Sequence, residues 1–582
     1  MRARRHHAFD PEPHREVLAP LVDAVARAGA LDARGLDRLV KRFPKRQDAG
    51  PGGLYSKSEI IAGFRAFGSR EPVSEEEFVA RLRLRPVRTL SGVTPVTVLT
   101  KPFPCPGTCV FCPSDVRMPK SYLSDEPGAQ RAEDNRFDPY LQTWARLAAY
   151  RAIGHPVDKV ELIVLGGTWS AYPEAYRVWF TKRCFDALND FGAGRDGRAD
   201  AGSAPADPGE RPPLDGRGDA TYNDVVPAAL HASERAGWED LEAAQRANEQ
   251  AGARCVGLVF ETRPDHVTER ELLHLRRLGA TRLQLGIQST DDDRLRDSAR
   301  GHDVATTRRA VALLRAAGFK LHAHWMPNLP GATPEADDRD FRRLFDDPAL
   351  RPDELKIYPG LRVESAPLVR WFERGDWKPY DDETLAALLG RCIERTPRWC
   401  RLTRVVRDFS AHDVAAGTHV ANLREVAERT LPRRPQEIRA REIRADDFAP
   451  ADLALRATAY DVATGRELFL ELVTPEDRLV AFLRLSLPAE RSFVDELGHA
   501  AVVRELHVYG AARRLGSRAG QGAQHGGLGT RLLEEAATRA RDAGYERLAV
   551  ISAVGTRAYY RRHGFADGVL YQARTLSPRV LA

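Results

Sequence analysis

Short apolar runs alternate with amphipathic segments between residues 93 and 360. Apolar runs of strand length that are joined by helices are typical of βα units around a parallel sheet. Six such runs predict strands at 94–100, 160–165, 255–261, 282–288, 320–326 and 354–358. The helices expected between them include 139–153, 267–278 and 305–317. We therefore predict an α/β fold with a partial parallel βα barrel, whose functional face lies at the carboxyl ends of its strands.

The rest of the chain has different patterns. Apolar positions at helical spacing, together with basic runs at 41–46 and 81–88, predict a helical, basic N-terminal region. The predicted parts are this region at 1–88, the barrel at 89–395, an Arg-rich connector at 396–440 and a second α/β domain at 441–582. Inside the barrel, residues 192–220 are rich in Gly, Pro, Ala and Asp, a composition that predicts a disordered insertion.

The second α/β domain is smaller than the barrel. Its strands are expected at 467–473, 479–487, 501–509 and 548–552, and its helices at 527–543 and 556–563. The last expected strand before residue 527 leads into a glycine-rich turn, and a long amphipathic helix follows it. A strand, a glycine-rich turn and a helix in this order are typical of phosphate-binding sites.

Composition narrows the class of protein. With 582 residues, 43% hydrophobic and 29% charged, the chain has the make-up of a globular protein with several domains. It has no run of about 18 apolar residues and no apolar signal segment near its start, so we expect a cytoplasmic protein without membrane contact. The net charge of +6 is small. From residues alone, the basic runs fit a solvated helix face and a surface for a phosphate backbone equally well.

Three of the seven cysteines lie together, directly after the first predicted strand. Cys105, Cys109 and Cys112 have the spacing C-x3-C-x2-C. Three thiolates on one loop can bind three irons of a [4Fe–4S] cluster and leave the fourth iron open to a small molecule. A structural zinc site would need a fourth ligand, and no Cys or His lies nearby in the sequence. The remaining cysteines are expected in the core, at Cys184, Cys255, Cys392 and Cys400.

A cysteine loop in this position resembles the radical S-adenosylmethionine (SAM) superfamily. The resemblance implies that SAM chelates the open iron and that its reductive cleavage gives a 5′-deoxyadenosyl radical. Gly166, Gly167 and Thr168 follow the second strand and resemble the motif that contacts the SAM amino group; a simple turn is the alternative. Polar residues at the other strand ends are candidate contacts for SAM or substrate, at 261–263, 288–289, 326–328 and 358–360; structural caps are the alternative for some of them.

A second motif lies before the helix expected at 527–543. Residues 524–529 read Q-x-x-G-x-G and resemble the pyrophosphate loop of GNAT acetyltransferases. A helix N-terminus offers free N–H groups to a diphosphate, and glycines allow close approach of the backbone. In GNAT enzymes a tyrosine at the position of Tyr560 sits near the thioester sulfur, although packing is the alternative. Glu505 and His507 alternate with apolar residues on the preceding strand, and one face of it can meet the acetyl group.

The two motifs occur together, with many further blocks in order, in the Elongator protein 3 family. The chain resembles its single-chain prokaryotic members over nearly its whole length, from SGVTPVTVLTKPFPCPG to AVISAVGTRAYYRRHGF. The resemblance implies a tRNA carboxymethyluridine synthase that acts on the wobble uridine. The implied cofactors are the cluster and SAM, with acetyl-CoA as cosubstrate. The acetyl methyl group loses hydrogen to the radical, the resulting carbon radical adds to uracil C5, and the thioester is hydrolysed.

The resemblance also implies roles for individual residues. The cluster ligands are Cys105, Cys109 and Cys112, and the catalytic candidates are Tyr560, His507 and Glu505. The expected acetyl-CoA contacts are Lys159, Glu505, Leu506, His507, Val508, Gln524, Gly527, Leu528, Gly529, Thr530 and Tyr560. The basic N-terminal region becomes a tRNA surface, for the anticodon stem-loop. A homodimer is considered, and the reductant stays unidentified.

Other functions remain to be weighed against this one. An N-acetyltransferase for proteins or small amines, with a relict iron–sulfur cluster, would act without SAM. A non-catalytic tRNA-binding scaffold would cleave no SAM. A third alternative keeps the radical chemistry and changes the substrate. The complete cysteine triad argues against the first, and the intact motifs in both domains argue against the second.

Overall fold

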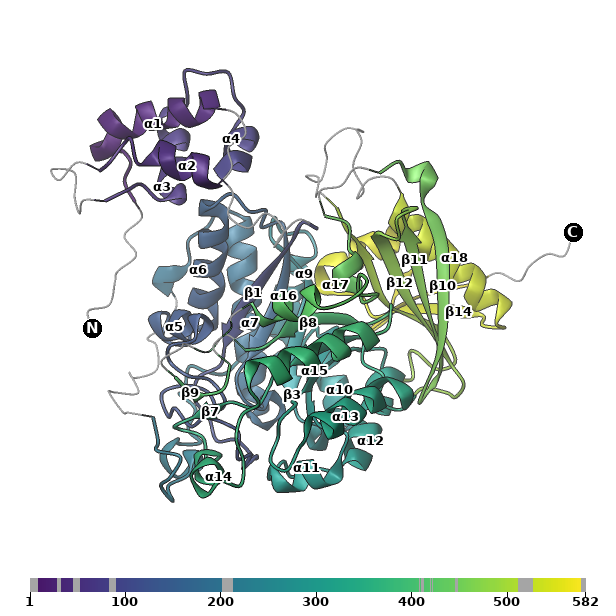
Figure 1. Cartoon of the computed structure of the whole chain (residues 1–582). Coiled ribbons are helices and arrows are strands. Elements are labelled where there is room, and N and C mark those ends of the chain that lie inside the picture. Colours follow the sequence, from purple (N-terminus) through teal and green to yellow (C-terminus); the bar gives the residue numbers. More distant parts are fainter. Residues whose placement is uncertain are drawn as a thin grey trace, which may run out of the picture.

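The computed structural model describes residues 9–28, 33–45, 53–82, 91–200, 213–407, 409, 413–418, 420, 422–444, 448–510 and 527–576. Figure 1 shows a small helical N-terminal region, a central barrel with helices around it, and a C-terminal sheet that packs against one end of the barrel. None of the helices in these residues is long and apolar enough to cross a membrane.

The central sheet has seven parallel strands in the order β1-β2-β3-β4-β5-β6-β8. The strands are β1 (Val93–Leu99), β2 (Lys159–Leu165), β3 (Arg254–Thr262), β4 (Arg282–Gln288), β5 (Lys320–Trp325), β6 (Glu354–Ile357) and β8 (Arg401–Val405). All six predicted strands are confirmed, and no pairing between β1 and β8 closes the barrel within the described residues. The assignment of 396–440 to a connector is wrong for β8, because Leu402 pairs with Leu355 of β6.

Helices cover the outer face of the barrel. They are α6 (Pro139–Ala152), α7 (Glu174–Gly192), α9 (Trp238–Asn248), α10 (Glu269–Arg277), α12 (Val304–Ala316), α13 (Pro334–Asp346) and α15 (Asp382–Arg395). Alternate residues of β2, such as Val160 and Leu162, are buried in the apolar core between sheet and helices. The residues between them, such as Glu161 and Ile163, are only partly buried. The inner face of the barrel is therefore open to water along this strand.

The C-terminal sheet has the order β10-β11-β12-β13-β14-β16-β15. Its strands are β10 (Ala454–Val462), β11 (Gly465–Val473), β12 (Leu479–Pro488), β13 (Ala501–Val508), β14 (Arg547–Val550), β15 (Ala566–Asp567) and β16 (Gln572–Thr575). The sequence prediction missed β10, a strand at the sheet edge. Helix α18 (Leu528–Asp542) packs on the sheet, with Leu532 and Leu533 in the core. β13 pairs in parallel with β14 only from Ala501 to Val503.

The N-terminal region folds around its own small core. Its helices are α1 (Arg15–Ala28), α2 (Ala33–Val40), α3 (Lys57–Phe67) and α4 (Glu75–Leu82). Part of the basic segment 81–88 lies outside the described residues. Within them, Lys45 pairs with Glu59 at 2.7 Å, and Arg81 donates to the carbonyl of Ala26. These two cations therefore stabilise the helical region itself.

The structure describes only the two ends of the insertion that the sequence predicts at 192–220. Residues 201–212 lie outside the described residues. These two ends are ordered, in contrast to the predicted disorder. At the first end, α7 continues to Gly192. At the second end, the backbone N–H groups of Leu214 and Gly216 donate to the carbonyls of Ser114 and Glu364, both at 2.9 Å. A glycine is required at 216, since a Cβ there would overlap the carbonyl of Ala366. The second end thus packs beside the cysteine loop.

Candidate active site

The cysteine loop lies at the carboxyl ends of β3 and β4. The sulfur of Cys109 accepts hydrogen bonds from Arg300 Nη1 at 3.2 Å and from Arg263 Nη1 at 3.8 Å. Arg263 directly follows β3, and Arg300 comes from the loop after α11 (Asp292–Asp297). The amide of Val110 also donates to the carbonyl of Ser298 at 3.1 Å. The loop after β1 is thereby fixed over neighbouring strands, on the face where the sequence predicts the active site.

The three thiols have different electrostatic surroundings. Burial would raise the pKa of Cys109, but the cations of Arg300 and Arg263 outweigh it and lower this pKa below its usual value. Burial raises the pKa of Cys112 to about 11, although Lys120 opposes the shift. Negative charge on Cys109 and Cys105 would raise this pKa further. Three thiolates so close together therefore favour a bound cationic centre.

The donor set fits a cluster better than a single ion. In the described part of the chain, no group of three or more His, Cys, Asp or Glu side chains is arranged to hold one metal ion. A [4Fe–4S] cluster binds each thiolate at a different iron, so its ligands do not converge on one point. N–H groups that donate to ligand sulfurs, as Arg300 does to Cys109, are a common feature of such sites. We infer that these residues fit the predicted cluster.

The glycine motif after β2 lies next to the first cysteine. Gly166 and Gly167 have φ angles of 137° and 65°, which favour glycine. A Cβ at Gly166 would overlap the hydroxyl of Thr100 at the end of β1. The hydroxyl of Thr168 lies 3.8 Å from the sulfur of Cys105. The motif therefore forms a tight turn against the cysteine loop, and a role in binding SAM stays a prediction for it.

The other strand ends have different roles. Arg263, in the segment 261–263, supports Cys109. Gln288 has a φ of 67°, and its buried side-chain oxygen has no hydrogen-bond partner among the described residues. Asn328 lies in a turn, where its backbone N–H donates to Asp337 Oδ2 at 2.7 Å and its backbone carbonyl accepts from Trp377 Nε1 at 2.9 Å. These backbone hydrogen bonds fit the structural alternative for Asn328, and a ligand contact by its side chain stays a prediction.

Glu505 takes part in ion pairs between the two domains. Its side chain accepts from Arg484 Nε at 2.9 Å and pairs with Lys320 of β5. The nearby cations of Lys320 and Arg484 outweigh burial and lower the pKa of Glu505 below its usual value. A carboxylate held by two cations is a weak base. The structure therefore favours a role in positioning β13 over the predicted catalytic role.

His507 lies two residues further along β13. Its ring centroid lies 4.3 Å from that of Tyr509 and 5.9 Å from that of Phe482. Burial lowers the pKa of His507 to about 4, and its Nε2 is buried without a hydrogen-bond partner in the described chain. His507 is therefore neutral at physiological pH. Leu506 and Val508, the other predicted contacts on this strand, are partly buried.

The start of α18 brings several predicted residues together. Gln524 lies outside the described residues, while Gly527, with a φ of 72°, precedes the helix and Leu528 is buried in the core. A Cβ at Gly529 would lie 2.6 Å from the hydroxyl of Tyr559. The hydroxyl of Thr530 lies 2.9 Å from His563 Nε2.

The two tyrosines near this helix differ in their surroundings. Tyr560 is buried, and its ring meets Phe565 edge-on at 5.6 Å. Tyr559 packs against His563 with ring centroids 4.4 Å apart. Sequence reasoning missed Tyr559 and His563 as neighbours of the glycine motif, because only the fold brings the segment 559–563 against α18.

Lys159 lies at the amino end of β2, at the end of the barrel opposite the cysteine loop. It begins β2, pairs in register with Arg254 of β3, and has a pKa lowered by burial. A Cβ at Gly555 of the C-terminal domain would lie 2.7 Å from the Cβ of Arg254. The C-terminal domain therefore docks on the amino ends of the strands. The predicted acetyl-CoA contacts and the predicted cluster ligands thus lie at opposite ends of one barrel.

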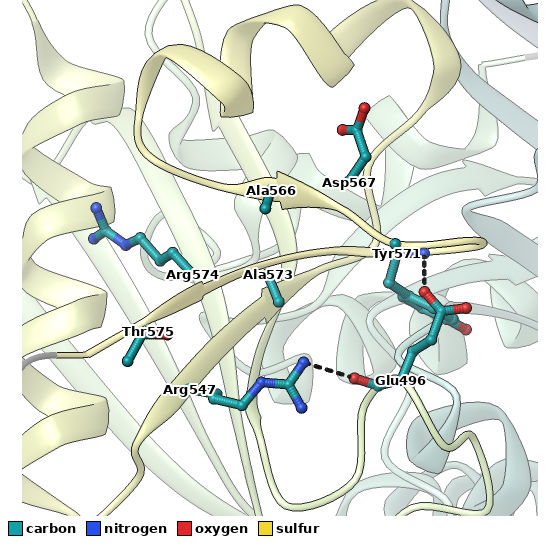
Figure 2. Close-up of a pocket in the computed structure, with 9 residues that line it drawn as sticks. Glu496, Arg547, Ala566, Asp567, Tyr571, Ala573, Arg574 and Thr575 are labelled. Atoms are coloured by element: carbon teal, nitrogen blue, oxygen red, sulfur yellow. Dashed lines mark hydrogen bonds between the residues drawn. The ribbon is translucent and has the colours of Figure 1, made fainter.

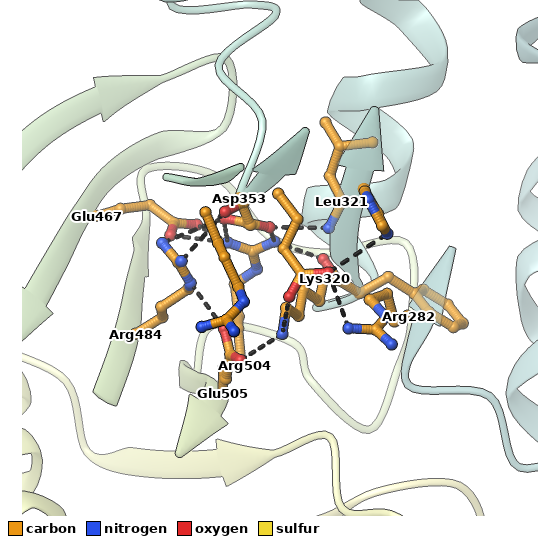
Figure 3. A network of polar contacts seen from close by, with 12 residues as sticks. Arg282, Lys320, Leu321, Asp353, Glu467, Arg484, Arg504 and Glu505 are labelled. Carbon is orange, nitrogen blue, oxygen red and sulfur yellow. Dashed lines mark hydrogen bonds and ion pairs between the residues drawn. The ribbon is translucent and has the colours of Figure 1, made fainter. Parts of the chain in front are cut away.

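A buried ionic network joins the two domains (Figure 3). Lys320, Asp353 and Glu354 lie at the amino ends of β5 and β6. From the C-terminal sheet, Arg504 donates to Glu467 at 2.7 Å and pairs with Asp353. A register shift in the β12–β13 pairing leaves Arg504 without a cross-strand partner, so its side chain is free to turn to the barrel. Because breaking a buried ion pair is strongly destabilising, this network opposes displacement of one domain against the other.

Figure 2 shows a pocket on the C-terminal sheet. Its charged groups already have partners: Glu496 accepts from the amides of Leu570 and Tyr571, and Arg574 pairs with Glu534 at 2.9 Å. None of the predicted site residues lines it. This pocket is therefore a poor candidate for the functional site.

Comparisons with known proteins find relatives over most of the chain. The family model of the Radical SAM superfamily matches residues 220–344, and that of the Radical_SAM C-terminal domain matches residues 352–433. A tRNA uridine(34) acetyltransferase from Dehalococcoides mccartyi is 38% identical over 490 residues, covering 82% of this chain and 96% of the relative. Elongator complex protein 3 from Danio rerio is 36% identical over 526 residues, covering 87% of this chain and 88% of the relative.

A solved structure supports the same relationship. The archaeal Elp3 of Methanocaldococcus infernus, with an N-terminal deletion, has a TM-score of 0.66 and 33% identity, and the match covers 84% of this chain and 100% of that one. The family prediction made from the sequence motifs is thus confirmed. By its similarity over most of its length, the chain belongs to the Elongator protein 3 family of radical SAM proteins.

Proposed function

We propose that the chain is a tRNA-modifying enzyme that forms 5-carboxymethyluridine at the wobble position, with SAM and acetyl-CoA as reactants. The relatives named tRNA uridine(34) acetyltransferase support the substrate class. The observation that carries the proposal is the placement of two predicted sites at the two ends of one barrel, with Cys109 at one end and β13 at the other. A protein that joins these sites can use an acyl group in a radical reaction.

At the cysteine end, Cys105, Cys109 and Cys112 would hold the iron–sulfur cluster. When bound, the cluster and SAM supply a primary carbon radical that can abstract a hydrogen atom. Arg263 and Arg300 hold the sulfur of Cys109 by hydrogen bonds, so they orient the loop. The turn at Gly166 and Gly167 keeps the backbone close to Cys105.

At the other end, acetyl-CoA would lie between β13 and the start of α18. The backbone of β13 from Glu505 to Val508 has no partner in β14 among the described residues, so it can bind an extended pantetheine chain. The first N–H groups of α18 would bind the diphosphate. His507 is neutral, and burial raises the pKa of Tyr560, so both present polar uncharged groups to the thioester.

The same geometry speaks against transfer of the acetyl group to an amine. That reaction needs a base that takes the amine proton as the acyl group moves. Glu505 is held by Lys320 and Arg484, and the pKa of His507 is about 4. Neither group is a good base at neutral pH. The acetyltransferase alternative with a relict cluster is therefore the weaker one.

The N-terminal helical region is the proposed tRNA surface. Arg27, Lys41 and Arg70 have side chains that are more than half exposed. Exposed cations bind RNA phosphates through charge, so binding of the anticodon stem-loop should weaken with salt. A homodimer stays a prediction.

The proposal is tested by following carbon from acetyl-CoA into tRNA. The anaerobically reconstituted chain is incubated with reductant, SAM, unmodified tRNA and acetyl-CoA labelled in its methyl carbon, and nucleosides are analysed by mass spectrometry. We expect labelled 5-carboxymethyluridine from the unaltered chain and none from Cys109→Ala. Cys184→Ala, which removes a buried core thiol, is the matched control and should retain activity. Absence of label from tRNA while SAM is still cleaved would refute the proposed substrate.

A further inference from the structure

The inner face of the barrel carries polar side chains, and some of them take no part in the proposed cluster site or in the ionic network. Along β2 and β3, the side chains of Glu161 and Glu261 are 29% and 24% exposed, so water reaches this face. Along β4, β5 and β6, the inward residues are polar. They are Arg282, Gln284, Lys320, His322, His324, Glu354 and Lys356. Arg282 and Lys320 both pair with Glu354, so the polar groups left for a ligand are those around Gln284.

Gln284, in the middle of β4, is held in a single orientation. Its side-chain oxygen accepts from Lys356 Nζ and lies 3.0 Å from His324 Nε2. An ammonium group can only donate, so the amide atom that it contacts must be the oxygen. The amide nitrogen of Gln284 makes no hydrogen bond within the described residues. The side-chain N–H group of Gln284 is therefore held in a fixed direction and is available to donate to a ligand.

Glu261 lies directly beside this donor. Glu261 and Gln284 are register partners in the β3–β4 pairing, and partners in neighbouring strands project from the same face. The carboxyl group of Glu261 makes no hydrogen bond to other described residues, and its nearest ionisable partner is His324 Nδ1 at 3.8 Å. Burial raises the pKa of Glu261, although Lys356, Arg407 and Arg300 oppose the shift. A carboxyl group accepts hydrogen bonds in both protonation states.

The pair lies close to the cysteine end of the barrel. Arg300, which donates to Cys109, also donates through Nη2 to the carbonyl of Gly286 at 2.6 Å. Gly286 is the next inward position of β4 after Gln284. The ring of Tyr358, at the end of β6, stands 5.5 Å from that of His324 and offers an aromatic surface on the same side. A ligand on Gln284 would thus lie next to the predicted radical site.

We propose that Gln284 and Glu261 form a recognition site for a uracil ring, with the Gln284 amide donating to a ring carbonyl and the Glu261 carboxyl accepting the N3–H. A donor next to an acceptor matches the C=O and N–H edge of uracil. The corresponding edge of cytosine has an amino donor and an N3 acceptor, so it opposes this pair. The inference rests on the proposed function and names the residues that select the base.

The test measures binding rather than turnover. The full chain, reconstituted with its cluster, is titrated with fluorescent anticodon stem-loops that carry uridine, cytidine or 3-methyluridine at the wobble position. We expect uridine to bind about ten-fold more tightly than either of the others. Gln284→Glu should remove this preference. Equal affinities for all three RNAs in the unaltered chain would overturn the proposal.

Two further variants keep the test independent of folding and of chemistry. Gln130→Glu makes the same charge change at an exposed position of α5 (Pro127–Asp134) and should keep the preference for uridine. The double variant Glu261→Gln, Gln284→Glu exchanges acceptor and donor, and should prefer cytidine. An unchanged preference for uridine in the double variant would also overturn the proposal. If the preference behaves as expected while no labelled nucleoside forms, the proposed reaction fails and the uracil site stands.

Discussion

At the scale of residues, neighbouring charges decide which groups near the two sites can titrate. The guanidinium groups of Arg300 and Arg263 lower the pKa of Cys109 despite its burial. No carboxylate makes a hydrogen bond to the ring of His507 among the described residues, and burial lowers its pKa to about 4. Both pKa values are thus lowered, but at Cys109 the shift favours the charged thiolate because two cations outweigh burial, and at His507 it favours the neutral imidazole because burial dominates.

The low pKa of His507 predicts a loss of stability in acid. In the unfolded chain the pKa of histidine is about 6.5. Between pH 6.5 and about 4, His507 is therefore protonated in the unfolded state and neutral in the folded state. The penalty is absent above pH 6.5 and grows to about 3 kcal/mol below pH 4.

Replacing the histidine should therefore reduce the acid sensitivity of the chain. We expect the melting temperature of His507→Gln to fall less than that of the unaltered chain between pH 7 and pH 4.5. His499→Gln, at an exposed position, serves as the control and should follow the unaltered chain. Identical pH profiles for His507→Gln and the unaltered chain would show that this imidazole titrates normally.

At the scale of elements, the turn after β2 depends on backbone conformation and on close approach. Gly166 has a φ of 137°, and a side chain there would overlap Thr100. Gly544, after α18, also has a positive φ, of 89°, but a Cβ added at this position would meet no atom within 4 Å. A side chain at Gly544 would therefore cost free energy through backbone conformation alone, whereas one at Gly166 would add the cost of steric overlap.

We expect Gly166→Ala to disturb the cysteine loop. Overlap with Thr100 forces the turn to move, so SAM affinity should fall at least ten-fold and the free energy of unfolding by about 3 kcal/mol. Gly544→Ala should cost about 1 kcal/mol and leave SAM affinity unchanged. For each variant, equilibrium binding measures the SAM affinity and thermal unfolding measures the stability. Equal losses in the two variants would contradict the role of the Gly166 turn.

The strands that the sequence predicted differ in residue pattern from those that it missed. The six barrel strands that lie between helices were predicted because their apolar runs are buried on the helix side. β8 was missed because its inward residues, Arg401 and Thr403, make the segment resemble a polar connector. β10 was missed because an edge strand exposes most of its residues and loses the alternation. Motifs identified His507 and Glu505, but the ion pair of Glu505 with Lys320 joins residues 185 positions apart and has no local signal.

At the scale of the whole molecule, the ionic network holds the C-terminal sheet on the amino ends of the barrel strands. Lys320 pairs with Glu354 at 2.9 Å within the barrel and with Glu505 across the interface. Its side chain is only 13% exposed. Removing one partner from a buried ion pair leaves an uncompensated charge, which is strongly destabilising.

Lys320→Met should therefore lower the free energy of unfolding by about 3 kcal/mol. Because Glu505 holds β13 in place, we also expect acetyl-CoA affinity to fall several-fold, while the iron–sulfur absorbance at the far end stays unchanged. Lys41→Met removes an exposed pair with Asp37 and should change neither stability nor affinity measurably. Loss of the cluster in Lys320→Met would show that the variant disturbs the whole barrel.

Transfer of deuterium shows whether both ends of the barrel serve one reaction. Acetyl-CoA with a fully deuterated methyl group is incubated anaerobically with the reconstituted chain, reductant, SAM and tRNA, and 5′-deoxyadenosine is analysed by mass spectrometry. We expect deuterium in 5′-deoxyadenosine from the unaltered chain. Formation of 5′-deoxyadenosine without deuterium, in the presence of bound acetyl-CoA and tRNA, would contradict this expectation.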